Sequence, residues 1–209
     1  MVRIKICGIT NLEDALLAAE LGADALGFIF YPKSPRKVAP EAARSIIAQL
    51  PPFVAAVGVF VDEDAAVVRA LAARVGLDWV QVHGQESPEY CRGLGRRAIK
   101  GFRIKDASSL KQLEPFRGAV QAFLLDTYIK GQVGGTGEVF DWHLAREAKK
   151  YGRIILAGGL TPYNVAQAIA TAQPDAVDAA SGSEAAPGRK DPVKLESFIN
   201  AIKAVGGGG

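Results

Sequence analysis

The chain has 209 residues, of which 49% are hydrophobic, enough to bury the core of a single domain. Its 25 Lys and Arg residues nearly balance 22 Asp and Glu residues, so the net charge of +3, without a cationic run, argues against a nucleic-acid partner. No apolar run has membrane-spanning length and the N-terminus lacks a secretory signal core, which favours a cytoplasmic protein with no membrane partner. Two cysteines and two histidines argue against a disulfide framework or a metal site, and no cofactor is expected.

Short β-branched runs alternate with Ala-, Leu- and Glu-rich stretches along the whole chain, without a linker-like break. The expected strands are residues 4–7, 25–30, 54–61, 79–82, 98–102, 122–126, 154–157 and 176–179. Eight such units predict one α/β domain, a (β/α)8 TIM barrel over residues 1–205, followed by a flexible glycine tail at residues 206–209. An open, doubly wound parallel sheet is the alternative, but the short connections favour closure.

Helix start signals follow several of these strands. Thr10 or Asn11 is expected to cap the first helix, and Asp62 precedes a helix predicted over residues 63–74. The residues of the first helix expected to pack against the barrel wall are Ala15, Leu16, Ala18 and Ala19.

Chemistry in an α/β barrel gathers at the C-terminal ends of the strands, so reactive side chains there are candidates. Cys7 ends the first strand and would be useful as a thiolate, with its pKa lowered by a nearby cation or backbone N–H groups. Asp126 and Asp178 emerge from two later buried strands. Core packing is the alternative for Cys7, and turn or capping roles are the alternatives for the carboxylates. A thiol and a carboxylate facing one pocket form an acid/base pair that moves protons without a metal.

Other polar side chains are expected at the same mouth. Arg36 lies in a cationic loop, and its guanidinium can hold a planar carboxylate by two parallel bonds, although a solvated loop is the plain alternative. Gln81 lies near the end of the fourth strand and His83 follows that strand, and His83 is expected to line the mouth rather than bind a metal. Phe30 ends the second predicted strand, Arg103 follows the fifth, and both are expected to face the mouth as well.

Three glycine-containing segments also follow strands: residues 134–137, 158–159 and 181–183. Loops after the seventh and eighth strands form the usual phosphate site of such barrels, through backbone N–H groups. Gly158, Gly159, Ser181 and Gly182 are therefore candidate phosphate ligands, with plain turns as the alternative.

Several motifs in this order resemble one family. They are residues 5–10 (Lys-Ile-Cys-Gly-Ile-Thr), 27–30, 34–36, 80–84, 124–126, 134–137, 156–160 and 181–184. Together they are similar, over nearly the whole chain, to the phosphoribosylanthranilate isomerases of tryptophan biosynthesis. In many relatives Val stands where this chain has Ser183, whose backbone N–H could still serve the phosphate.

The resemblance implies a cofactor-free Amadori rearrangement of N-(5-phosphoribosyl)anthranilate to 1-(2-carboxyphenylamino)-1-deoxyribulose 5-phosphate. Asp126 would be the general acid that opens the furanose ring, and Cys7 the general base that takes the C2′ proton. Arg36 would hold the anthranilate carboxylate. The other implied substrate-binding residues are Gln81, His83, Asp178, Gly135, Gly158, Gly159, Ser181 and Gly182. The expected partner is this small molecule, and the chain would be a monomer or a homodimer.

Two other enzyme activities and one non-catalytic role are alternatives to this interpretation. The related histidine-pathway isomerase has Asp where this chain has Cys7 and repeats a phosphate motif that is not seen here. A metal-dependent epimerase would need histidines at other positions. A catalytically silent phosphate-binding barrel is disfavoured because Cys7, Asp126 and Arg36 are all present.

Overall fold

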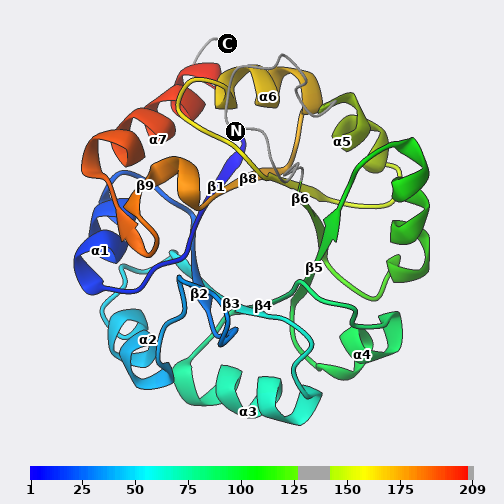
Figure 1. Cartoon of the computed structure of the whole chain (residues 1–209), viewed down its shortest axis with the longest axis horizontal. Helices are drawn as coiled ribbons and strands as arrows, with labels where there is room; N and C mark the ends of the chain where they lie inside the picture. Colours follow the sequence, from blue (N-terminus) through cyan, green and yellow to red (C-terminus); the bar gives the residue numbers. More distant parts are fainter. Residues whose placement is uncertain (127–141, 207–209) are drawn as a thin grey trace.

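The computed structural model describes residues 1–126 and 142–206. Eight parallel strands, hydrogen-bonded in chain order, close into a barrel with helices around it (Figure 1). The strands are β1 (Arg3–Cys7), β2 (Ala25–Ile29), β3 (Ala55–Phe60), β4 (Trp79–Val82), β5 (Ala98–Arg103), β6 (Ala122–Asp126), β7 (Ile154–Ala157) and β8 (Ala176–Ala179). The predicted (β/α)8 barrel is confirmed, and the pairing of β1 with β8 rules out an open sheet.

The outer layer consists mainly of helices in the connections between strands. They are α1 (Leu12–Glu20), α2 (Pro40–Ile47), α3 (Ala65–Val75), α4 (Pro88–Gly93), the 3-10 segment η1 (Ala107–Phe116), α5 (Trp142–Ala148), α6 (Val165–Ala172) and α7 (Pro192–Gly206). Gly206 thus belongs to a helix, and the rest of the glycine tail lies outside the described residues. In the described part of the chain, no helix is long and apolar enough to cross a membrane.

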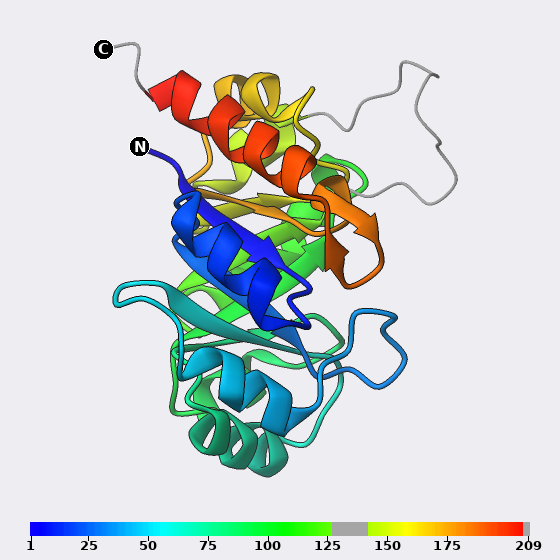
Figure 2. The same ribbon diagram turned by 90° about the vertical axis from the view of Figure 1, so that its left-hand side faces the viewer.

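A short insertion separates β8 from α7. The 3-10 turn η2 (Ser181–Ser183) leads into a hairpin of β9 (Glu184–Ala186) and β10 (Arg189–Lys190). This hairpin lies beside α1 at the end of the barrel opposite the N-terminus (Figures 1 and 2). The backbone N–H of Lys190 donates to Asp14 of α1 at 2.8 Å, which attaches the hairpin to the first βα unit.

Side chains alternate along each strand between the barrel interior and the helix layer, as the period of two requires. On β6, Leu124 belongs to the cluster inside the barrel, whereas Phe123 and Leu125 belong to the larger cluster that includes the helices. Burying each such large side chain contributes roughly 1.5–3 kcal/mol, so both faces hold the barrel together. The alternation also turns Asp126, two residues beyond Leu124, toward the barrel interior.

The first helix packs by a narrower face than predicted. Asn11 is its cap, with the side chain accepting the N–H of Asp14 at 2.9 Å, while Thr10 instead donates to the carbonyl of Gly188. Ala15 and Ala18 are buried as predicted and Ala19 is half-buried, but Leu16 is 39% exposed. The predicted contact of Leu16 with the barrel wall is therefore wrong.

The third helix starts later than predicted. Asp64, not Asp62, is its cap and accepts the N–H groups of Ala66 and Val67 at 2.7 and 3.3 Å. Asp62 has a positive φ of 52° in the turn after β3 and accepts the N–H of Gln85 instead. Either aspartate satisfies the capping pattern in the sequence, and the path of the turn selects the second.

Candidate active site

A cavity of about 420 Å³ opens at the C-terminal end of the barrel. The predicted site residues that line it are Cys7, Arg36, Gln81, His83, Asp126, Gly158, Gly159, Asp178, Ser181 and Gly182. They come from strand ends far apart in the sequence, and closure of the barrel brings them together. Gly135 lies outside the described residues.

Two residues predicted at this mouth lie elsewhere. Phe30 follows the inward-facing Ile29, so its ring points to the helix layer and stacks on Phe60 with 5.3 Å between centroids. Arg103 is exposed and lines a neighbouring cavity of about 580 Å³, whose lining also includes the buried ion pair of Glu86 and Lys100. That cavity is larger, but the candidate acid and base both line the smaller one.

Cys7 is buried at the end of β1, and a glycine on the neighbouring strand makes room for it. Gly27 pairs with Cys7 in the barrel, and a Cβ atom at that glycine would lie 2.7 Å from Sγ. Burial raises the pKa of the Cys7 thiol, and Asp178 raises it further, against the lowering effect of Lys5 and Lys190. The pKa of Cys7 therefore lies above its usual value, and the thiol is the resting form. The two lysines oppose this shift, because a nearby cation stabilises the thiolate.

Lys5 was not recognised as a site residue from the sequence. Its side chain is 4% exposed, and Nζ donates to Asp178 at 2.9 Å. Burial lowers the pKa of Lys5, but Asp178 and Cys7 outweigh this effect and raise the pKa above its usual value. The signal was present, since Lys5 is two residues before Cys7 on one strand and faces the same side of the sheet.

His83 and Gln81 line the opposite part of the cavity. A Cβ atom at Gly101 would lie 2.7 Å from Nδ1 of His83, so that glycine gives the ring its space. Burial lowers the pKa of His83 despite Asp126, whose Oδ2 lies 3.7 Å from Nε2, which favours the neutral imidazole. Gln81 approaches Nδ1 of His83 at 3.3 Å, and its own buried Oε1 accepts no hydrogen bond from the described residues. A ligand hydroxyl would satisfy that oxygen.

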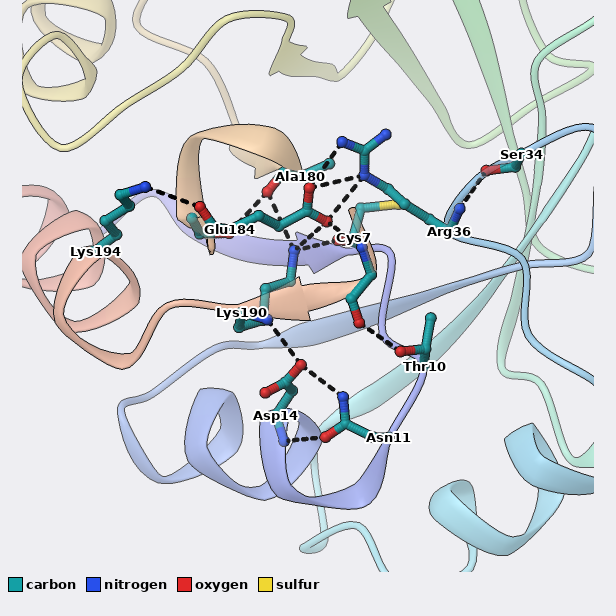
Figure 3. A network of polar contacts seen from close by, with 12 residues as sticks. Cys7, Thr10, Asn11, Asp14, Ser34, Arg36, Ala180, Glu184, Lys190 and Lys194 are labelled. Carbon is teal, nitrogen blue, oxygen red and sulfur yellow. Dashed lines mark hydrogen bonds and ion pairs between the residues drawn. The ribbon is translucent and has the colours of Figure 1, made fainter. Parts of the chain in front are cut away.

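Arg36 reaches the mouth across the end of β1, where it meets a carboxylate of this chain. Its Nε lies 2.9 Å from both carboxylate oxygens of Glu184, and Nη2 lies 2.7 Å from Oε2 (Figure 3). The two-bond fork predicted for a ligand is therefore engaged by Glu184, through Nε and Nη2. Gly8 permits this path, because a Cβ atom there would lie 2.8 Å from Cδ of Arg36.

The loops after β7 and β8 meet at one edge of the cavity. Gly158 and Gly159 both have positive φ, and a Cβ atom at Gly182 would collide with the carbonyl oxygen of Leu160. The glycines thus let the two loops approach closely. Ser183 is fully buried, and its N–H donates to the carbonyl of Ala180 at 3.3 Å. This bond closes the η2 turn, and a contact of the same N–H with a phosphate stays a prediction.

The fold and the site together define a class of protein. Polar side chains gather at the C-terminal mouth of a (β/α)8 barrel, next to glycine loops after β7 and β8, as in barrel enzymes that act on phosphorylated substrates. In residues 1–126 and 142–206, no group of three or more His, Cys, Asp or Glu side chains is placed to hold a metal ion.

Known proteins match the chain over nearly its full length. The family model for N-(5′-phosphoribosyl)anthranilate (PRA) isomerase matches residues 4–201. The isomerase of that name from Geobacter sulfurreducens is 55% identical over 203 residues, covering 97% of this chain and 99% of the relative. A crystal structure of a phosphoribosyl anthranilate isomerase with reduced 1-(o-carboxyphenylamino)-1-deoxyribulose 5-phosphate is 43% identical, with a TM-score of 0.88, and covers 98% of this chain and 100% of that one. A crystal structure of monomers generated from the dimeric phosphoribosylanthranilate isomerase of Thermotoga maritima is 42% identical, with a TM-score of 0.87 and the same coverage.

The chain belongs to the N-(5′-phosphoribosyl)anthranilate isomerase family. The prediction of an isomerase of tryptophan biosynthesis is confirmed, and the competing activities are set aside. The roles of individual site residues stay predictions and are taken up next.

Proposed function

We propose that the chain converts N-(5′-phosphoribosyl)anthranilate into 1-(2-carboxyphenylamino)-1-deoxyribulose 5-phosphate by acid/base catalysis between Asp126 and Cys7. The observation that carries this proposal is that both side chains line one cavity of about 420 Å³, from β6 and β1 respectively. A related isomerase that is 43% identical binds a reduced form of this product. The reaction is an internal redox isomerisation, so proton transfers alone suffice.

The first step opens the sugar ring. Protonated Asp126 donates its proton to the ring oxygen, the bond from C1′ to that oxygen breaks, and the nitrogen lone pair forms the C=N bond of a Schiff base. His83 lies beside Asp126, with 3.7 Å between Nε2 and Oδ2. Because burial lowers the pKa of His83, the ring favours its neutral form and adds no full positive charge beside Asp126.

The second step moves the proton from C2′. The Cys7 thiolate takes this proton, and the electron pair of the C–H bond forms the C1′–C2′ double bond of an enolamine as the nitrogen becomes neutral. Loss of the enol proton and protonation at C1′ then give the ketone. Lys5 is the cation on the same strand face, held at 2.9 Å by Asp178, and it favours the thiolate.

Binding groups surround these two residues. We assign the phosphate to the backbone around Gly158, Gly159, Ser181 and Gly182, where the two glycine loops approach each other. Arg36 would meet the anthranilate carboxylate, with Nη1 outside the fork that holds Glu184. Gln81, with its unsatisfied Oε1, and Asp178 would contact the sugar hydroxyls.

The direct test is a fluorescence assay that follows consumption of freshly generated phosphoribosylanthranilate in the presence of EDTA. The proposal expects turnover by the parent protein and its loss in Cys7→Ala. Turnover by a folded Cys7→Ala variant at the parental rate would contradict the role of Cys7. No turnover by the folded parent would contradict the substrate.

We also propose that the chain forms a homodimer through the N-terminal end of the barrel. The segment between α2 and β3 projects on the same side as the N-terminus (Figure 2), and its Phe53 is fully exposed with a positive φ of 72°. An apolar cavity of about 260 Å³ opens on this end, lined by residues such as Val57, Trp79 and Ile99. A ring held out from one copy fits a cavity of this kind in another. The relative from Thermotoga maritima is described as dimeric.

The cytoplasm is the compartment that we propose for this reaction. Cys7 and Cys91 are both free and buried thiols, and the proposed base must stay reduced to work. Fractionation of the native cells, followed by the same fluorescence assay, tests this location. Activity recovered outside the cytoplasmic fraction would contradict it.

A further inference from the structure

We infer that Lys190 is a positioning residue for this isomerase. It holds three parts of the structure in one arrangement: the end of β1 at Cys7, the loop after β8, and the ion pair of Arg36 with Glu184, here called the Arg36 clamp. This inference rests on the roles proposed for Cys7 and Arg36. Lys190 lies on the β10 strand of the hairpin, outside the cavity, and does not line it.

The ammonium of Lys190 has three partners from three segments. Nζ donates to the carbonyl of Cys7 at 2.7 Å and to the carbonyl of Ala180 at 3.2 Å, and it lies 3.4 Å from Oε1 of Glu184 (Figure 3). An ammonium has three protons, so this set matches its capacity. The ends of β1 and β8, which carry the base and the start of the phosphate loop, are thereby tied to one charge.

The same ammonium supports the Arg36 clamp. Glu184 is 4% exposed at its side chain and lies between Lys190 and Arg36. Its two cationic neighbours favour the carboxylate form, and the pKa of Glu184 lies below its usual value although burial alone would raise it. A buried carboxylate with two cations is held in one rotamer, so Arg36 is presented to the cavity in a fixed direction.

The hairpin that carries Lys190 is itself held by α1 and the turn before it. The backbone N–H of Lys190 donates to Asp14 at 2.8 Å, and Asp14 is fixed in turn by Asn11 at the start of α1. Thr10 donates to the carbonyl of Gly188 at the tip of the hairpin. The position of the ammonium is thus set by α1 as well as by its own partners, which is the arrangement expected of a preorganised support.

Lys190 also contributes charge near the proposed base. The charged groups that face Cys7 are Lys5 from β1, Asp178 from β8, Lys190 from β10 and Arg36 from the segment after β2. Lys5 and Lys190 lower the pKa of Cys7, whereas Asp178 raises it. Removing Lys190 would therefore raise the pKa of Cys7 and reduce its thiolate fraction at neutral pH.

Two variants separate the charge of Lys190 from its hydrogen bonds. Lys190→Met removes both, while Lys190→Gln keeps a donor for the carbonyls without the charge. Lys149→Met is the matched control, because Lys149 also donates to a carbonyl, that of Gln173 at 2.6 Å, but on an exposed surface away from the cavity. The measurements are thermal unfolding and the pH profiles of kcat and kcat/KM.

We expect kcat/KM of Lys190→Met to fall by about 10- to 100-fold, as for misplaced catalytic groups, with KM raised because Arg36 is less well held. The acidic limb of the profile should move to higher pH in both Lys190 variants, and Lys190→Gln should recover part of the KM. Lys149→Met should match the parent. A parental KM and an unmoved limb in a folded Lys190→Met variant would overturn the inference.

Two further outcomes also decide the matter. If neither Lys190 variant folds, Lys190 is a structural residue and the inference is overturned. If the acidic limb of the parent is also present at the same pH in Cys7→Ser, the limb does not report Cys7 and the proposed base is wrong, whatever the Lys190 variants show. Failure of the proposed function and failure of the inference are thus distinguishable.

Discussion

The two ends of this barrel are lined by inward-facing residues of the same strands, yet their chemistry differs. At the C-terminal end β4 presents Gln81 and β6 presents Asp126, whereas at the N-terminal end the same strands present Trp79 and Ala122. The inward positions follow one period of two along each strand. Position along the strand, rather than the face of the strand, therefore separates the polar mouth from the apolar one.

An apolar layer lies between the two ends. It consists of Val57, Ile99, Ala122, Leu124, Ile155 and Ala157, with Trp79 among the residues packed against it. This layer lies between the two cavities, and Lys5 bridges them, since it lines the N-terminal cavity and its Nζ donates to Asp178 of the C-terminal cavity at 2.9 Å. Changes at the C-terminal mouth should alter catalysis, and changes at the N-terminal end should alter assembly.

The largest effect should come from the two proposed proton-transfer groups. Cys7→Ala and Asp126→Asn should each lower kcat by about 10²- to 10⁴-fold, the range expected for loss of a general acid or base. The thermal unfolding midpoint should stay close to that of the parent, since both side chains lie at the cavity rather than in the apolar layer. Near-parental kcat in both variants would show that the acid/base assignment is wrong.

A smaller effect is expected for the clamp at the rim. Arg36→Met should raise KM by about 10- to 100-fold, the equivalent of one charge-assisted hydrogen bond of roughly 1.5–3 kcal/mol, and should change kcat less. Lys33→Met is the matched control, because Lys33 is an exposed cation of the same loop that does not line the cavity. An unchanged KM in Arg36→Met would remove the proposed carboxylate contact.

The smallest effect on catalysis should come from the N-terminal end. Phe53→Asp should convert a dimer to a monomer in analytical ultracentrifugation while kcat stays parental, because burying a carboxylate against the mostly apolar surface of that cavity is costly. Val67→Asp, which changes a 48% exposed side chain on α3, should leave the dimer intact. A parent protein that sediments as a monomer would contradict the proposed dimer.

The barrel strands and several residues of the C-terminal mouth could be predicted from the sequence. Buried strands are read from β-branched runs, and the strands over 79–82, 122–126, 154–157 and 176–179 match the structure. Strand ends then identify Cys7, Gln81 and Asp126 as neighbours in space, because closure of a barrel brings all such ends to one mouth.

The errors have a physical cause as well. Phe30 is expected at the mouth because it ends the predicted strand over residues 25–30, but β2 ends at Ile29 and the period of two turns Phe30 outward, away from the cavity. Glu184 and Lys190 were missed, since their importance arises from a hairpin that folds back on α1 across more than 170 residues of chain. A buried lysine in a short hairpin has no local pattern that distinguishes it from a solvated one.

The most direct test of the central claim is a kinetic isotope effect with substrate deuterated at C2′. Cys7→Ser should show a larger primary effect on kcat than the parent, because proton abstraction from C2′ becomes slower relative to ring opening. Asp126→Asn should show a smaller effect, because ring opening becomes rate-limiting. The reverse pattern, with the isotope effect enlarged in Asp126→Asn and suppressed in Cys7→Ser, would contradict the assignment of Cys7 as base and Asp126 as acid.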